Sequence, residues 1–196
     1  MRSVYDLFEQ LAKEPKYLLS GETLDSVRDY FHGYTDGLAE ANIDIQEGDP
    51  PFSQFASWLA RRYGKSQKSL YGRWTRYNGG WWRIIEEQFG AGKSGFKAFF
   101  DLVTEFRERK RILIAKTAIS PDATRLDADN LTQLEAVEYV PNDGYYLDFI
   151  YVDGRMKVEG FYSTLEDLLA SAAEQYEISP DCWELFTKED GGTSAV

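Results

Sequence analysis

The sequence predicts an α+β fold, with a helical N-terminal part over residues 1–118 and a small antiparallel sheet with a packed C-terminal helix over residues 119–196. Up to about residue 106, apolar side chains recur at intervals of three and four, the period of an amphipathic helix. Beyond about residue 120, short β-prone runs alternate with turn sequences. The chain is long enough for the two parts to form one compact unit.

Three helices are expected in the first third of the chain. Ser3 is the expected N-cap of the first helix, and Pro15 ends it. The second helix begins behind Thr23 or Gly21, and its apolar side chains again follow the helical period. A third follows the proline-rich break at residues 48–51, where proline disfavours helix in the residue before it.

Two more helices are expected before the helical pattern gives way to β-prone runs near residue 120. A short one covers residues 81–89 and stops at Gly90. Ser94 is the expected N-cap of a longer one, which continues through residue 111 and at its longest to residue 115. The basic and aromatic segment 65–77 yields no predicted element.

The sequence of residues 119–196 predicts an antiparallel sheet. Residues 120–130 are turn-rich and acidic, which favours a linker, and residues 133–140 form a strand that ends at a Pro-Asn-Asp-Gly turn. Two β-prone runs, 145–152 and 155–162, flank Asp153-Gly154, which predicts a hairpin with a type I′ turn.

A helix and an edge strand complete the predicted second part. Ser163 or Thr164 caps a helix over residues 165–176, whose apolar side chains would pack it onto the sheet. Residues 183–186 are expected to add a short strand at the edge.

The charge of the chain is concentrated in this second part. From Lys116 onward the sequence has 17 acidic and 5 basic residues, whereas residues 1–115 have 16 acidic and 17 basic ones. An acidic folded surface repels nucleic acid and anionic lipid and attracts basic proteins. The sequence therefore predicts a non-enzymatic protein that binds a basic partner protein and no membrane.

The residues that carry common catalytic chemistry are scarce. His32 and Cys182 are the only histidine and cysteine, so ordinary zinc sites and His-dependent nucleophiles find no support. The sequence at 90–94 ends in Gly-Lys-Ser but has Glu87 where a phosphate loop needs glycine. No catalytic residue, cofactor or metal is predicted, and a hydrolase with a carboxylate-only site has no residues to support it. The single cysteine and the absence of a long apolar run predict a cytoplasmic location.

A basic segment offers an alternative function. Residues 61–111 contain 13 basic and 5 acidic side chains among several tryptophans and tyrosines. Interleaved arginine and aromatic residues can contact phosphates and stack on single-stranded bases. The same pattern is also expected if the tryptophans are core with arginines stacked on their rims, or if the segment pairs internally with the acidic region from Lys116 onward. A third alternative is that the segment binds a protein. The nucleic-acid alternative would use Arg73, Trp74, Arg76, Trp81 and Arg83.

Part of the acidic half resembles a known family. The run 139–149, followed by Gly154, Val158 and the segment 163–169, is similar to the C-terminal half of SUKH-superfamily immunity proteins. In that family an apolar-proline turn, a strand, a hairpin and a capped helix follow one another. The resemblance implies a bacterial antitoxin-like protein that neutralises a toxin, often a nuclease, by direct binding.

Acids and tyrosines around the hairpin and the last helix are the predicted contact residues, because tyrosine is enriched at interface centres. Alternation along a strand lets only about half of the strand residues face outward. The alternative is that these tyrosines pack the core and the acids only aid solubility. The candidates are Asp143, Tyr145, Tyr146, Asp148, Tyr151, Asp153, Glu159, Glu166 and Asp167.

Overall fold

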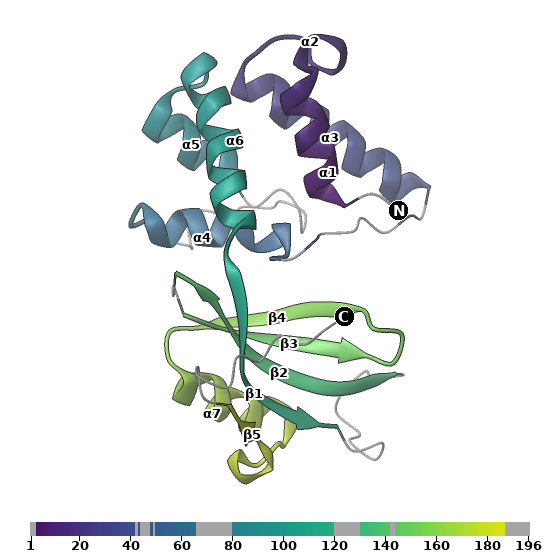
Figure 1. The fold of residues 1–196 in the computed structure, drawn as a ribbon, viewed down its shortest axis with the longest axis vertical. Coiled ribbons are helices and arrows are strands. Elements are labelled where there is room, and N and C mark those ends of the chain that lie inside the picture. Colours follow the sequence, from purple (N-terminus) through teal and green to yellow (C-terminus); the bar gives the residue numbers. More distant parts are fainter. Residues whose placement is uncertain are drawn as a thin grey trace. The chain divides into compact units, whose positions relative to one another are not determined.

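The computed structural model confirms the α+β class, with helices followed by an antiparallel sheet and a further helix (Figure 1). The described residues are 3–41, 43, 48, 50–65, 80–119, 130–141 and 144–186. Most of the undetermined segment 65–77 and nearly all of the predicted linker 120–130 lie outside them.

The chain divides into two compact units, Met1–Glu108 and Arg109–Val196. We call them the helical unit and the sheet unit. The division falls earlier than the boundary predicted at residue 118, because residues that were expected to continue a helix form the first strand.

The helical unit contains the predicted helices in the predicted order. Their bounds are α1 Val4–Lys13, α2 Pro15–Leu18, α3 Leu24–Glu40, the 3₁₀ helix η1 Phe52–Gln54, α4 Phe55–Arg62, α5 Trp81–Phe89 and α6 Lys93–Arg107.

Side-chain caps set where the first and third helices begin. Ser3 and Asp6 form a reciprocal capping box at the start of α1, and the hydroxyl of Thr23 accepts from the amide of Ser26 at the start of α3. The prediction for α6 was wrong, because its N-cap is Gly92 and no side chain caps it. Ser94 is instead the second residue of the helix.

The core of the helical unit is built from aromatic rings. Phe8 packs against Phe31, Phe52 and Phe99, with ring centroids between 4.8 and 5.4 Å apart. Trp81 adds its indole at 4.8 Å from the ring of Phe99 and is only 1% exposed. These rings come from α1, α3, η1, α5 and α6 and hold those helices together.

The sheet unit begins with a strand that the sequence analysis had assigned to a helix. Residues predicted to extend the long helix as far as 111 or 115 instead form β1, which pairs with β2 along its length. The charges of 107–111 fit a helix terminus, but Ile112 and Ile114 are β-branched, which favours a strand, and the segment gains cross-strand pairs with β2 on both sides of a bulge at Ile114. Tertiary pairing therefore decides the state of this segment.

The strands form one antiparallel sheet in the order β4-β3-β2-β1-β5, as Figure 1 shows. The predicted edge strand is present and pairs with β1. The strands and the last helices are β1 Lys110–Ala118, β2 Leu131–Val140, β3 Tyr145–Tyr151, β4 Met156–Tyr162, α7 Leu165–Tyr176, the 3₁₀ helix η3 Pro180–Cys182 and β5 Glu184–Leu185.

The hairpin β3–β4 forms where Asp153-Gly154 predicts it, but its turn is not type I′. The amide of Gly154 donates to the carbonyl of Tyr151, and the amide of Tyr151 donates to the carbonyl of Arg155. Only Gly154 has a positive φ, at 78°, while Asp153 does not. The loop thus has three residues, with glycine in the left-handed position that follows a tight turn.

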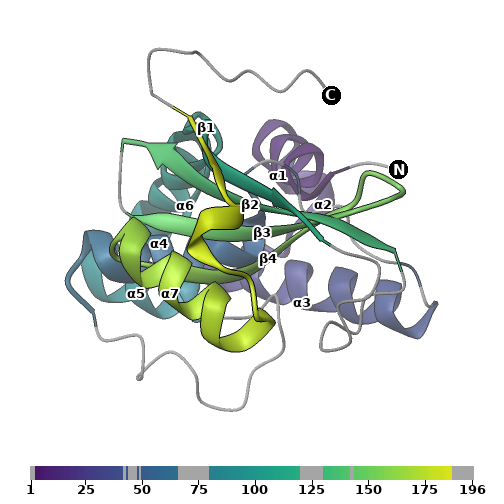
Figure 2. The same ribbon diagram turned by 90° about the horizontal axis from the view of Figure 1, so that it is seen from below.

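Helix α7 covers one face of the sheet and contacts β3 and β4 (Figure 2). Leu168 and Ala172 are fully buried against Leu147 and Phe149 of β3. The predicted cap is confirmed at Thr164, whose hydroxyl accepts from the amide of Asp167. On the opposite face, Val137, Tyr139 and Tyr146 form a second buried cluster.

The end of α7 stores backbone strain that a substitution can release. Glu177 is the C-cap residue and has φ +59°, a conformation that glycine adopts without cost. We expect Glu177→Gly to stabilise the protein by about 1 kcal/mol in urea unfolding followed by circular dichroism. The matched change Glu174→Gly, in the last turn of the helix, should destabilise it by about 0.5–1 kcal/mol. Equal effects of the two changes would contradict the assignment of strain.

Candidate functional site

The exposed face of α7 is acidic. Glu166, Asp167 and Glu174 are exposed, and Glu177 follows on the same side, at offsets of 0, 1, 8 and 11 residues. The helix contains no lysine or arginine. Among the described residues, no basic side chain forms an ion pair with Glu166, Asp167 or Glu174. We call Glu166, Asp167, Glu174 and Glu177 the α7 acidic face.

Two of these four acids lie where negative charge destabilises the helix. Glu166 and Asp167 lie in the first turn, where negative charge interacts favourably with the helix dipole. Glu174 and Glu177 lie at the other end, where negative charge is unfavourable, and they repel each other at a spacing of three residues. Solubility alone would not require acids at these two positions.

Strand β4 continues the acidic face. Its Glu159 is exposed and accepts a hydrogen bond from the hydroxyl of Tyr176 on α7 at 3.5 Å. Burial and the neighbouring Glu159 charge raise the pKa of Tyr176 to about 12, so the hydroxyl remains a donor at neutral pH. A second tie joins the hydroxyls of Tyr162 and Ser171 at 3.0 Å. These contacts fix the position of the helix relative to the strand.

The structure divides the predicted contact residues into two groups. Glu159, Glu166 and Asp167 are exposed, as is Asp153 at the hairpin turn. Asp153 is already engaged, because hydrogen bonds from the backbone and side chain of Arg155 hold the pKa of its carboxyl below the usual range. Glu159 likewise has a partner, Lys157, at 3.0 Å.

The other candidates lie away from solvent or outside the described residues. Tyr146 and Asp148 are fully buried, so neither can be a surface contact. Tyr145 and Tyr151 are half-buried and pack against the cluster under α7. Asp143 lies outside the described residues. Tyr146 therefore serves the core, as the alternative predicted, and Tyr145 and Tyr151 do so in part.

Asp148 is buried because β1 supplies its counter-charge. Arg111 donates to Asp148 at 2.8 Å and to Glu135 at 2.6 Å, and Gln133 donates to the second oxygen of Glu135 at 2.6 Å. Glu135 and Asp148 are directly opposite each other on β2 and β3. Without the guanidinium, two carboxylates would face each other across the sheet with little access to water.

The neighbouring Arg109 is also buried, with 5% exposure. It donates to the carbonyl of Tyr139 at 3.3 Å, and its guanidinium lies 5.3 Å from the ring of the same tyrosine. Arg109 and Arg111 were counted in the basic segment of the sequence, but both serve the interior of the sheet unit.

Most of the other described basic residues of this segment are paired or stacked. Arg62 binds Glu105, Lys65 binds Glu87 at 2.6 Å, and Lys97 binds Asp101 at 2.5 Å. These three pairs lie within the helical unit, whereas the predicted pairing with the acidic region beyond Lys116 is seen at Arg111 among the described residues.

Of the five residues of the nucleic-acid alternative, the structure describes Trp81 and Arg83. Trp81 is a core residue, so bases cannot stack on it. Arg83 is exposed, but its guanidinium lies 5.0 Å from the ring of Trp82. Arg73, Trp74 and Arg76 lie outside the described residues.

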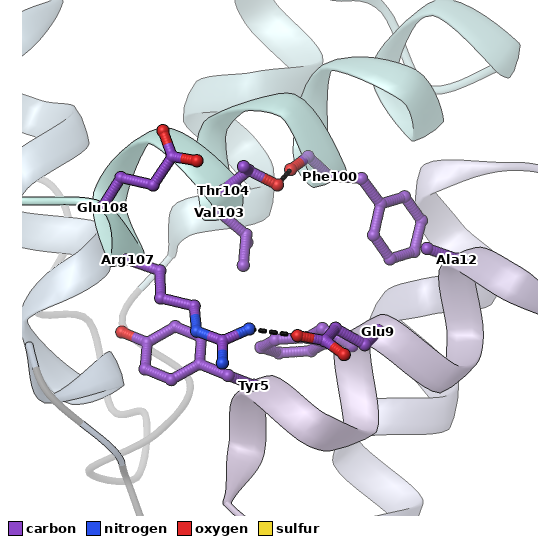
Figure 3. Close-up of a pocket in the computed structure, with 9 residues that line it drawn as sticks. Tyr5, Glu9, Ala12, Phe100, Val103, Thr104, Arg107 and Glu108 are labelled. Carbon is purple, nitrogen blue, oxygen red and sulfur yellow. Dashed lines mark hydrogen bonds and ion pairs between the residues drawn. The ribbon is translucent and has the colours of Figure 1, made fainter.

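A pocket of about 420 Å³ lies between α1 and α6 of the helical unit (Figure 3). Its walls are mainly apolar, and its mouth carries the ion pair between Arg107 and Glu9. The guanidinium of Arg107 also lies 5.5 Å from the ring of Tyr5. No pattern in the sequence had predicted this pocket. The lining residues are Tyr5, Phe8, Glu9, Ala12, Phe100, Val103, Thr104, Arg107 and Glu108.

Glu9 has two basic neighbours. The hydrogen bond and charge of Arg107, with a further contribution from Lys13, hold the pKa of Glu9 below its ordinary value. Lys13 lies one turn further along α1, 3.6 Å from Glu9. Glu9 would therefore keep a counter-charge if Arg107 turned to another group.

The histidine and the cysteine lie in different units of the chain. Burial, with a smaller effect of Arg28, lowers the pKa of His32, which favours a neutral ring at pH 7. Cys182 is exposed and free. No group of three potential ligands among histidine, cysteine, aspartate and glutamate occurs in the described part of the chain. None of its described helices is both long and apolar enough to cross a membrane.

Comparisons of the chain with protein-family models, with curated proteins and with solved structures gave no match in any of the three. The resemblance to SUKH-superfamily immunity proteins therefore stays a prediction. The function has to be argued from the geometry of the chain itself.

The buried Arg111 network generates a stability prediction. Arg111→Met leaves Glu135 and Asp148 buried without a counter-charge, which should cost about 3–5 kcal/mol of unfolding free energy. Urea unfolding monitored by circular dichroism measures this loss.

The control for that prediction is the triple variant Arg111→Met, Glu135→Gln, Asp148→Asn. It removes the buried charges together with their partner, so we expect it to recover part of the lost free energy. If the triple variant were as unstable as Arg111→Met alone, uncompensated charge would not be the cause.

Proposed function

We propose that this protein is a non-enzymatic binding protein of the immunity type, which docks the α7 acidic face onto a basic partner and so neutralises it. The observation that carries the proposal is the arrangement of four acids on the solvent side of one helix that has no basic residue. Negative potential on a rigid surface accelerates association with a basic protein and sets its orientation.

The ion pairs within the sheet unit reduce the number of acids that are left to contact a partner protein. Asp148, Asp153 and Glu159 have basic partners within the unit. Glu166, Asp167 and Glu174 do not have one among the described residues. The contact surface is therefore centred on α7.

A basic nuclease is the partner class that fits this surface and the SUKH resemblance together. Enzymes that cut nucleic acid bind polyanions, so their active sites carry positive charge. A folded acidic helix can occupy such a site without offering a cleavable bond. On this proposal we expect the gene of a secreted basic toxin beside the gene of this protein, and co-expression of the two to restore growth.

The variant that tests the surface neutralises Glu166→Gln, Asp167→Asn and Glu174→Gln together. We expect its association rate with the toxin to fall roughly tenfold at low ionic strength, and the rate to lose most of its salt dependence. Stopped-flow fluorescence measures the rate, and growth of the co-expressing cells gives a second readout. The amides keep the shape of the side chains, and Asn still fits the first helical turn.

The matched control neutralises three exposed acids of the helical unit, Asp36→Asn, Glu40→Gln and Glu86→Gln. It changes the net charge by the same amount at other places. The proposal requires this control to associate at nearly the wild-type rate. If both triple variants slowed association equally, net charge would be responsible, and the α7 acidic face would have no special role.

A further inference from the structure

The pocket between α1 and α6 is independent of the surface just described, since all of its lining residues belong to the helical unit. Its volume of about 420 Å³ lies in the range of small-molecule sites. Tyr5, Phe8 and Val103 form a floor that is at most 5% exposed, so the bottom is apolar and already packed. Such a floor suits the apolar body of a ligand.

The mouth of the pocket decides the charge of that ligand. In Figure 3, Arg107 reaches across the opening to Glu9, and Phe100 faces it near Ala12. A cation at Glu9 would meet two positive charges, from Arg107 and Lys13. An anion at Arg107 would instead replace Glu9, which keeps Lys13 as its partner.

The position of the Arg107 guanidinium also allows it to change its acceptor from Glu9 to a ligand anion. It is stacked 5.5 Å from the ring of Tyr5, whose hydroxyl donates to the carbonyl of Pro50. A stacked guanidinium keeps its plane while its N–H groups change acceptor. Glu108, the other acid of the pocket, points away from the Arg107–Glu9 pair in Figure 3.

We propose that the α1–α6 pocket binds a small amphipathic organic anion, with an aromatic or aliphatic body on the floor of Tyr5, Phe8 and Val103 and an anionic group on Arg107. Glu9 acts as the internal competitor that occupies Arg107 when the ligand is absent. Planar, charge-assisted hydrogen bonds from arginine suit carboxylates and related anions.

The probe for the test is 8-anilinonaphthalene-1-sulfonate, an aromatic anion whose fluorescence rises in apolar surroundings, added to the full-length protein. N-phenyl-1-naphthylamine is the matched neutral probe, because it has the same aromatic body without the sulfonate. We expect the anionic probe to bind at one saturable site, and more tightly than the neutral one.

Two variants should change the affinity for the anionic probe in opposite directions. Arg107→Gln should lower the affinity for the anionic probe roughly tenfold, as expected for the loss of one charge-assisted hydrogen bond. Glu9→Gln should strengthen it several-fold, since the competitor for Arg107 is gone. Neither variant should change the affinity for the neutral probe by more than about twofold. Glu86→Gln, an exposed acid on α5 away from the pocket, should change nothing.

A third variant locates the binding. Ala12 is exposed and lines the mouth, so Ala12→Trp fills the pocket without disturbing the core, and it should abolish the binding of both probes. Unchanged circular dichroism confirms that each variant is folded. The proposal is overturned if no saturable binding occurs, if the anionic probe still binds Ala12→Trp, or if Arg107→Gln and Glu9→Gln shift both probes alike.

Discussion

The pairing of β1 with β2 is the interaction on which the sheet unit depends. It converts Lys110–Ala118 from a segment with helical charge pattern into a strand at the side of β2. It delivers Arg111 to Glu135 and Asp148, which would otherwise be two buried acids facing each other. It also provides the edge to which β5 adds. A loss of this pairing would leave charge inside the sheet and the edge strand without a partner.

Ion pairs within the sheet unit determine which acids remain for a partner protein. Internal arginines and lysines engage the acids on the strands and at the hairpin turn, whereas α7 has no basic residue of its own. Its two C-terminal acids oppose the helix dipole, and Glu177 also holds a left-handed backbone. These features cost folding free energy at one end of a short helix, a pattern that function explains better than stability does.

The helical unit follows a different principle, because aromatic packing holds it together. Rings from α1 and α5 meet Phe99 of α6, and Phe31 of α3 joins them through Phe8. Trp81 belongs to this core and not to a surface for bases. The pocket opens where α1 and α6 are joined by an ion pair at the mouth rather than by closely packed apolar side chains. An exchangeable ion pair above an apolar floor is a means of selecting the charge of a ligand.

Much of the fold could be predicted because it rests on local chemistry. Ser3, Thr23 and Thr164 mark helix starts, and Gly90 and Gly154 mark places where the chain needs a positive φ. Ser94 was misassigned because a residue that suits a cap is only one of several that can precede a helix, and Gly92 takes that place. The turn at Asp153 was misassigned because two turn geometries share the same dipeptide.

What the sequence determined by itself was therefore the α+β order, the caps, the hairpin and the acidity of the second part, since each depends on residues close together in the chain. Only the tertiary structure decided that residues 110–118 are a strand, that Asp148 and Tyr146 are buried, and that Glu9 meets Arg107. The physical reason is distance along the chain. Glu9 and Arg107 are 98 residues apart, and Arg111 and Asp148 are 37 apart, so no local pattern records either contact.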